Sequence, residues 1–396
     1  MLPLDCGQDF EIAREDDFFA ALPPRPAVFV IEPKQEAGRV FLSRTVDLRR
    51  RLERLLRPPE PSSKRLNLRA VAARVRYRLT GSPFEQSLVL YDHVRAFHPR
   101  RYRDFLRLRP PVLLKLSLAG EYPRCYVTRR VLAGNAFYFG PFASRKSADA
   151  FSNEFLNLFK IRRCQIKIRR DPSFPGCIYS EMKMCLAPCF AGCSIEEYDV
   201  EVGRVRDFLA TSGISLTSEL EREREAASES LDFERAASIH KKIEKVTDVL
   251  RGLPDLPRRL EDLNAVLLQL AAEENTIAVF HIQAGRIADP FFLRFAEMQS
   301  QPRSIEAILR EKLFPASGKE AIVESPHHSI PQSEDHLSLL ARWFYGKPRL
   351  GEIFLAQPVV SAGGLLDWPY RRIIRACSRL LAPPAQPLST APEIST

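Results

Sequence analysis

Five cysteines fall within thirty residues of this 396-residue chain, and this cluster restricts the possible folds more than any other feature. Twelve, seven, three and three residues separate its members, which are Cys164, Cys177, Cys185, Cys189 and Cys193. Four thiolates can hold a zinc ion or an iron–sulfur cluster, because both require soft, charged sulfur ligands. The two wide spacings fit an iron–sulfur cluster at least as well as zinc. We therefore expect a metal centre, with buried free thiols as the alternative.

The compartment decides whether such cysteines stay reduced. The segment Met1–Asp5 has neither the basic region nor the apolar stretch of a signal peptide, so we expect a cytoplasmic protein with reduced thiols. No run approaches the roughly 18 apolar residues that a membrane span needs, so we expect no contact with a membrane. A hydrophobic content of 45% in 396 residues predicts several domains with cores of their own.

The positive charge of the chain is concentrated in one segment. Residues 49–109 hold 17 Lys and Arg against 5 Asp and Glu, or 17 − 5 = +12, whereas the whole chain carries +10. All but one of these basic residues are arginines, which form two-point contacts with phosphate oxygens. The segment therefore predicts a nucleic-acid-binding surface. The alternative is a solubilising face or a rim of ion pairs, although few acids lie nearby in the sequence to form them.

The pattern of apolar residues predicts an α+β protein. Two runs, 27–31 and 39–43, predict a β-hairpin, and a helix with leucines on one face follows at 48–56. Further helices are expected at 64–79, 84–98, 145–160, 195–251 (with a turn at Ser212–Gly213), 303–313 and 336–345. Further strands are expected at 112–118, 125–128, 137–142, 265–270, 277–282 and 290–295. The tail 383–396 is expected to be disordered.

The cysteine segment resembles a known family. Cys164, Pro175-Gly176-Cys177-Ile178-Tyr179 and Cys185-Leu186-Ala187-Pro188-Cys189 are similar to the cysteine block of UvrC, the incision subunit of bacterial nucleotide excision repair. The likeness runs from about Leu22 to beyond Leu250. It implies a [4Fe–4S] cluster held by Cys164, Cys177, Cys185 and Cys189, with zinc as the alternative and Cys193 as an additional residue.

The resemblance also implies a domain organisation. The expected parts are an N-terminal extension (1–21), a degenerate GIY-YIG-like nuclease domain of α/β type (22–105), a cysteine-cluster domain (106–210), a UVR-like helical hairpin (211–252) and a C-terminal mixed α/β domain (258–382). We find no counterpart of the family's RNase H-like and helix-hairpin-helix domains, and we expect both to be missing.

The implied nuclease site lacks the groups that cut DNA. In the family, two tyrosines, a helix arginine and a metal-binding glutamate hydrolyse the phosphodiester. Here Phe29 and Phe41 replace the tyrosines, Tyr91 replaces the glutamate, and only Arg51 matches the phosphate-stabilising arginine. A neutral phenol is a weak ligand for Mg²⁺ or Mn²⁺, so we expect this site to bind phosphate and to cleave weakly or not at all. A rival hypothesis moves the carboxylate to Glu85 or Asp92.

Two binding surfaces follow from these arguments. The predicted DNA contacts are Arg44, Arg49, Arg50, Arg51, Arg54 and Arg103. Residues 216–251 resemble the UVR motif, through which UvrC docks onto UvrB, and the implied partner contacts are Leu231, Phe233, Ala236, Ala237 and Ile243. The 3–4 spacing of Ala236, Ile239, Ile243, Val246 and Leu250 is equally typical of an internal seam. Arg224 and His240-Lys241 depart from the motif.

Three functional hypotheses follow. The first is a DNA-binding protein of excision repair that cleaves weakly or not at all. The second is a structure-specific endonuclease that makes the three-prime incision. The third is a protein-binding scaffold whose basic segment meets an acidic partner.

Overall fold

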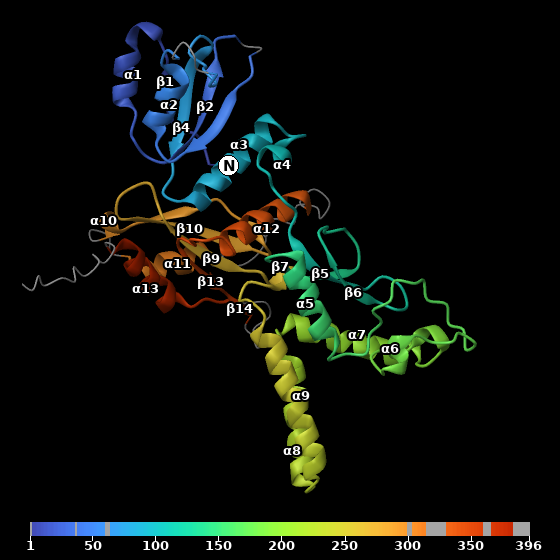
Figure 1. Cartoon of the computed structure of the whole chain (residues 1–396). Helices are drawn as coiled ribbons and strands as arrows, with labels where there is room; N and C mark the ends of the chain where they lie inside the picture. Colours follow the sequence, from blue (N-terminus) through green and yellow to red (C-terminus); the bar gives the residue numbers. More distant parts are fainter. Residues whose placement is uncertain are drawn as a thin grey trace, which may run out of the picture.

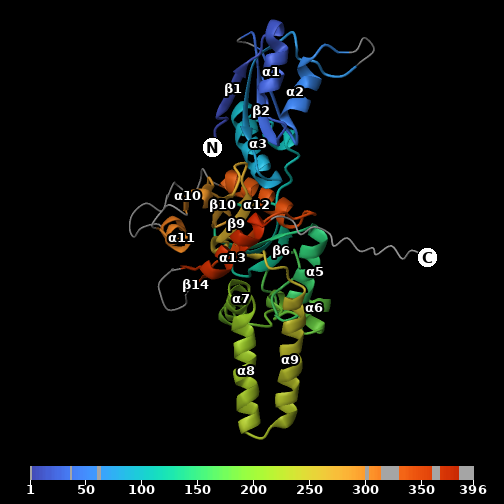
Figure 2. The ribbon, with the colours of Figure 1, turned by 90° about the vertical axis from the view of Figure 1, so that its left-hand side faces the viewer.

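The computed structural model describes residues 2–35, 38–59, 64–298, 303–313, 330–358 and 366–382. It confirms an α+β architecture. Figures 1 and 2 show an elongated molecule with an N-terminal sheet at one end, a long helical hairpin at the other, and a body of two sheets between them. No helix in the described ranges is both long enough and apolar enough to cross a bilayer. The predicted disordered tail, 383–396, lies outside the described residues.

The N-terminal sheet has the strand order β1-β4-β2-β3, and all its neighbours are antiparallel. Its strands are β1 (Cys6–Asp9), β2 (Ala27–Pro33), β3 (Phe41–Thr45) and β4 (Ala72–Leu79). The β2–β3 pair confirms the predicted hairpin. Strand β1 and helix α1 (Glu15–Ala21), which follows the short helix η1 (Ile12–Arg14), make the predicted extension part of this unit.

The helix predicted over 64–79 is wrong, because β4 occupies residues 72–79. Three exposed or half-exposed arginines, Arg74, Arg76 and Arg78, alternate there with buried Val75 and Tyr77. This two-residue period belongs to a strand.

Helices cover both faces of this sheet. Helices α1 and α2 (Leu48–Leu56) pack with Phe29 in one cluster, and α3 (Pro83–Phe97) packs with Val28 and Val30 in another. The faces differ because successive strand residues point to opposite sides. Helix α2 starts where the Asp47 side chain accepts a hydrogen bond from the Arg50 backbone N–H. The short helix α4 (Tyr102–Phe105) follows α3.

The middle sheet, in the order β6-β5-β7-β8, carries the cysteine segment and the hairpin at its side. Its helix α5 ends at Leu156, four residues before the predicted end. The predicted helical region 195–251 is divided into three helices, with the expected turn at Gly213. The elements are β5 (Val112–Ser117), β6 (Arg124–Thr128), β7 (Ala136–Phe142), β8 (Arg258–Arg259), α5 (Arg145–Leu156), α6 (Ile178–Glu181), η2 (Pro188–Phe190), α7 (Ile195–Ala210), α8 (Ile214–Glu229) and α9 (Phe233–Arg251).

The C-terminal sheet has the order β11-β10-β9-β13, with β12 paired to β10, and helices cover both faces. Helix α12 lies between this sheet and α3, so it joins the C-terminal unit to the N-terminal unit (Figure 1). The predicted strands and both predicted helices are present, although α12 begins at Ile330 rather than at 336. The elements are η3 (Leu260–Asp262), β9 (Ala265–Leu270), β10 (Thr276–Gln283), β11 (Arg286–Ile287), β12 (Phe291–Arg294), α10 (Phe295–Met298), α11 (Ile305–Leu313), α12 (Ile330–Phe344), β13 (Glu352–Leu355), β14 (Gln357–Pro358), β15 (Leu366–Asp367) and α13 (Tyr370–Leu381).

Candidate nucleic-acid interface and cysteine cluster

Helix α2 offers three arginines that are free for a ligand. No side-chain hydrogen bond or ion pair engages Arg50, Arg51 or Arg54 within the described ranges, and Arg50 and Arg54 are exposed. The Nε of Arg51 is buried and also lacks a hydrogen-bond partner there. Leaving a buried donor unsatisfied costs free energy, and a phosphate oxygen would satisfy it. These three predicted DNA contacts are therefore available to bind phosphate.

Arg49, another predicted DNA contact, has a structural role instead. Its Nε donates to the carbonyl of Leu22 at 2.7 Å, and its Nη2 donates to the carbonyl of Ala20 at 3.0 Å. These carbonyls lie at the end of α1, where helix geometry leaves backbone oxygens without intrahelical partners. Arg49 thus holds α2 against α1, and its role differs from that of the free arginines.

Several other arginines of the basic segment form ion pairs with acids from outside it. Arg78 lies 3.1 Å from Asp5, Arg76 lies 3.5 Å from Glu32, and Arg69 pairs with Glu15. Arg57 lies 3.4 Å from Asp16, and Arg74 lies 3.7 Å from Asp9. The ion-pair alternative therefore holds for this part of the segment. The charge count over residues 49–109 did not include these acids, because they precede residue 49.

Of the three positions predicted to be degenerate in a nuclease site, Phe29 and Phe41 lie together and Tyr91 lies in another cluster. Phe29 is fully buried beneath α1 and α2, with its ring centroid 6.2 Å from that of Phe41. Tyr91 is also fully buried, but it packs in the cluster formed with the C-terminal sheet. Its hydroxyl donates to Asp335 Oδ2 at 3.2 Å. The residue that stands at the family's metal-binding position therefore faces α12.

Asp335 is the centre of a buried polar network that the sequence did not reveal. The hydroxyl of Tyr102 donates to Asp335 Oδ2 at 2.7 Å, and Arg103 Nε donates to Oδ1 at 2.8 Å. Arg103 also lies 3.4 Å from Glu334. Burial raises the pKa of Tyr91, so its neutral phenol donates to the carboxylate. Arg103, which we predicted to contact DNA, is thus used to join α4 to α12.

The rival carboxylates also have structural partners. Glu85 is buried, accepts a hydrogen bond from the Gly81 N–H at 2.8 Å and lies 3.8 Å from Arg78, and burial raises its pKa. Burial raises the pKa of Asp92 to about 6, and its carboxylate interacts with the backbone of Leu2. Among the described residues, neither carboxylate forms a hydrogen bond or an ion pair with Arg51.

Arg44 extends the positive surface toward the C-terminal unit. Its Nη1 donates to Ser87 Oγ at 2.9 Å. The pKa of Arg342 on α12 is lowered, first by burial and then by the charges of Arg44 and Arg109. Arginines from three separate segments therefore lie close enough to influence one another.

The four predicted metal ligands lie in one irregular segment. Burial raises the pKa of Cys185 to about 11, and the charges of Cys164, Cys177 and Cys189 add to this effect. The Ala187 N–H donates to the Cys185 sulfur at 3.3 Å, and Arg162 Nη1 lies 4.0 Å from the Cys164 sulfur. Across the described ranges, no three His, Cys, Asp or Glu side chains are arranged to hold a metal ion.

The chemistry of this donor set fits a metal centre. Four sulfurs are soft ligands, and the N–H and guanidinium groups beside them suit the negative charge of a thiolate-bound cluster. Between α5 and α7 the described chain forms only the short helices α6 and η2. Cys193 is different, because it is buried in the main core beside α7.

The hairpin separates the predicted partner contacts into two groups. Leu231, between α8 and α9, is 72% exposed, and Phe233, the first residue of α9, is 67% exposed. Ala237 is exposed as well. Ala236 and Ile243 instead pack against the core cluster that contains Ile239 and Val246. These two residues belong to the internal seam, and Leu231, Phe233 and Ala237 are the predicted partner contacts that remain exposed.

Comparison with known proteins agrees with this architecture. Residues 112–208 match the family model of the UvrC/Cho excinuclease middle domain, and residues 215–246 match that of the UvrB/uvrC motif. The chain is 25% identical over 364 residues to UvrABC system protein C of Acetivibrio thermocellus, covering 87% of this chain and 56% of that protein. The corresponding protein of Moorella thermoacetica is 26% identical over 345 residues, which are 87% of this chain and 55% of that protein.

Sequence identity is higher over a shorter part of the chain. The UvrABC system protein C of Ruminiclostridium cellulolyticum is 31% identical over 175 residues, which are 44% of this chain and 28% of that protein. The chain spans about half the length of the curated relatives it matches over most of its residues. No solved structure is significantly similar to it. The chain is thus similar to UvrC-family proteins over most of its residues, and it matches in order the models of the UvrC/Cho middle domain and of the UvrB/uvrC motif.

Proposed function

We propose that this protein binds DNA in bacterial nucleotide excision repair as a UvrC-like factor whose N-terminal, GIY-YIG-like unit cleaves weakly or not at all. The names of its relatives and the two family matches support the repair role. One observation supports weak or absent cleavage: Tyr91, at the proposed position of the metal-binding glutamate, is buried against Asp335 on α12. The cytoplasm, where the DNA lies, remains the expected compartment.

The chemistry of the N-terminal unit explains the expected lack of cutting. Hydrolysis of a phosphodiester needs a deprotonated nucleophile and a cation that stabilises the charge on phosphorus. Phe29 and Phe41 have no hydroxyl to handle a proton, and Tyr91 offers no carboxylate to a divalent metal. Loss of the metal alone costs several kcal/mol of transition-state stabilisation, or roughly three decades in rate.

The unit keeps the means to bind phosphate. Arg50, Arg51 and Arg54 extend from one helix without carboxylate partners among the described residues, and the Nε of Arg51 is buried without an acceptor there. Arginine binds phosphate oxygens through two N–H groups at once, so three such side chains can follow a DNA backbone. These residues therefore form the proposed contact with duplex DNA.

The proposed metal centre is a [4Fe–4S] cluster on Cys164, Cys177, Cys185 and Cys189. When bound, such a cluster would supply a rigid cross-link for a segment that otherwise has little regular structure. Zinc is the alternative ligand of the same sulfurs. An absorption spectrum of anaerobically purified protein distinguishes them, because an iron–sulfur cluster absorbs broadly in the violet and zinc is colourless. A zinc-loaded, colourless sample would refute the cluster.

The proposed protein partner is UvrB, bound at the tip of the hairpin. Exposed Leu231 and Phe233 are the two large apolar side chains available there. Large exposed apolar groups are typical of protein-binding sites. Phe233→Ala should weaken binding to UvrB, whereas Ser238→Ala, at an exposed position on the same helix, should not. Equal binding by both variants would exclude this site.

The decisive experiment is a nicking assay on damaged, UvrB-loaded DNA with Mg²⁺ or Mn²⁺. We expect specific, salt-dependent binding without accumulation of a nicked strand. Efficient nicking that is lost on Arg51→Ala would instead establish the active three-prime endonuclease. Absence of DNA binding at low salt would favour the protein-binding scaffold.

A further inference from the structure

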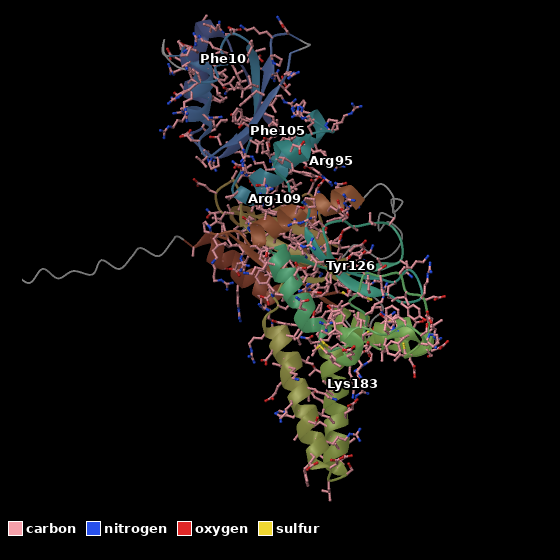
Figure 3. All side chains as sticks on the ribbon, turned by 45° about the vertical axis from the view of Figure 1, so that its right-hand side comes forward. Phe10, Arg95, Phe105, Arg109, Tyr126 and Lys183 are labelled. Atoms are coloured by element: carbon pink, nitrogen blue, oxygen red, sulfur yellow. The ribbon has the colours of Figure 1, made fainter. Side chains whose placement is uncertain are left out.

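The end of α3 and the adjoining α4 carry exposed aromatic rings among arginines. Phe97 is 43% exposed and Phe105 is 51% exposed, which is unusual for phenylalanine. The ring of Phe105 stacks on His98, with centroids 5.8 Å apart and planes 21° from parallel. Figure 3 shows Arg95, Phe105 and Arg109 around this region. We call the surface formed by residues 95–109 the α3–α4 platform.

The platform carries a strong positive charge. Residues 95–109 contain six arginines and one acid, Asp104, or 6 − 1 = +5. Only Arg103 forms an ion pair with described residues, through Asp335 and Glu334. The other five arginines, which have no carboxylate partner in the described ranges, are Arg95, Arg100, Arg101, Arg107 and Arg109. An apolar partner would not need this charge, whereas a polyanion would.

The platform is also held in place before any ligand arrives. Arg103 joins α4 to Asp335, and Arg342 on α12 donates to the carbonyl of Arg107 at 2.8 Å. Both connections come from the C-terminal unit. A surface fixed in this way loses little conformational entropy on binding, which favours affinity.

We infer that the α3–α4 platform binds the unpaired nucleotides of a DNA strand, with bases stacking on Phe105 and Phe97 and phosphates contacting the arginines around them. Exposed aromatic rings within a positive surface are the combination that binds single strands, because every base has a face that can stack. A duplex hides these faces between its base pairs. The inference rests on the proposed DNA-binding function and adds a second site, separate from α2, for a second form of DNA.

The test separates stacking from charge. The affinity of the full-length protein for a short oligodeoxythymidylate is measured by fluorescence anisotropy over a series of salt concentrations. The double variant Phe97→Ala/Phe105→Ala should bind at least roughly 30-fold more weakly at every salt concentration, the loss of two stacked bases. Its salt dependence should not change, because no charge has been removed. Phe105→Trp should bind at least as well as the unaltered protein.

Arginine variants should show the opposite behaviour. Arg100→Gln/Arg101→Gln removes two charges, so the slope of log affinity against log salt should fall by about 1.4, at roughly 0.7 per phosphate contact on a single strand. The matched control is Val200→Ala, which shortens an exposed apolar side chain on α7, outside the proposed binding sites, and should leave both quantities unchanged.

Duplex DNA of the same length provides the second arm. The phenylalanine variants should bind it normally, because α2 makes that contact. The inference is overturned if Phe97→Ala/Phe105→Ala binds the single strand as Val200→Ala does, or if it loses duplex and single-strand binding equally. Failure of the protein to bind duplex DNA would contradict the proposed function, and the single-strand measurement would still decide the platform.

Discussion

Helix α2 and the α3–α4 platform have similar arginine-rich sequences but different surroundings. In α2, Arg49 is bound to the end of α1, and the free arginines Arg50, Arg51 and Arg54 have no exposed aromatic ring on the same helix. In the platform, Arg103 is bound to Asp335 and Arg95 to the Tyr91 hydroxyl, and the same segment contributes four other arginines and exposed Phe97 and Phe105.

The comparison teaches that equal charge does not mean equal ligands. A row of arginines alone contacts the phosphates of any nucleic acid, and arginines beside exposed rings also provide stacking for unpaired bases. In each region one arginine joins its helix to a neighbouring helix, and other arginines have no acidic partner among the described residues. The two regions also contact different neighbours: α2 is hydrogen-bonded to the end of α1, and the platform is hydrogen-bonded to α12.

The largest expected effect comes from restoring the family's glutamate. Tyr91→Glu would place a carboxylate beside buried Asp335, so we expect a loss of about 3–5 kcal/mol in the free energy of unfolding, measured in urea. No nicking activity should appear, because position 91 faces α12. The control Tyr91→Phe removes one hydrogen bond and should cost only about 1 kcal/mol. A stable Tyr91→Glu variant that cuts DNA would contradict the placement of position 91 against α12.

Removing the free arginines of α2 should affect duplex binding next most strongly. Arg50→Gln/Arg51→Gln/Arg54→Gln should lower the slope of log affinity against log salt by about 2.7, at roughly 0.9 per phosphate contact. Single-strand binding at the platform should change much less. The matched control, Lys241→Gln/Lys242→Gln/Lys245→Gln, removes the same charge from exposed positions of α9 and should leave the slope unchanged. Equal slopes for the two triple variants would remove α2 from the interface.

Acid should loosen the contact beneath the platform. Burial lowers the pKa of His336 on α12 to about 4, and its Nδ1 accepts a hydrogen bond from the Ile287 N–H at 2.9 Å. A histidine with a depressed pKa contributes stability above its unfolded pKa of about 6.5, and this stability is lost as the pH falls toward 4. We expect a loss of about 2 kcal/mol by pH 5. Urea midpoints of the protein and of His336→Gln should converge over this range, and parallel curves would contradict the assignment.

The smallest effect should come from Arg49. Arg49→Gln removes two hydrogen bonds to the end of α1 and should cost about 1 kcal/mol of stability. The salt dependence of duplex binding should be unchanged, because this guanidinium faces α1. A fall in slope equal to that of Arg50→Gln would show that Arg49 contacts DNA, and would remove the distinction between fastening and free arginines.

The sequence predicted much of the fold where local periodicity was strong. The leucines of α2, the β2–β3 hairpin, strands β9 and β10 and the turn at Gly213 were all visible in it. Strand β4 was missed because its charges hid its two-residue period. The hairpin seam was ambiguous, since 3–4 spacing describes any packed helix face, and only the position of α8 showed that Ala236 and Ile243 point inward.

By itself, the sequence determined which chemical groups the protein has: a set of five closely spaced cysteines, many arginines, and phenylalanines at the two positions where we predict that tyrosines are lost. Only the tertiary structure decided which groups are free to act. Arg103 meets Asp335 across 232 positions of the chain, and three acids that pair with β4, Asp5, Asp9 and Glu32, come from the first 32 residues. Charge attracts through space and not along the sequence, so a local count of residues cannot say which arginines remain for a ligand.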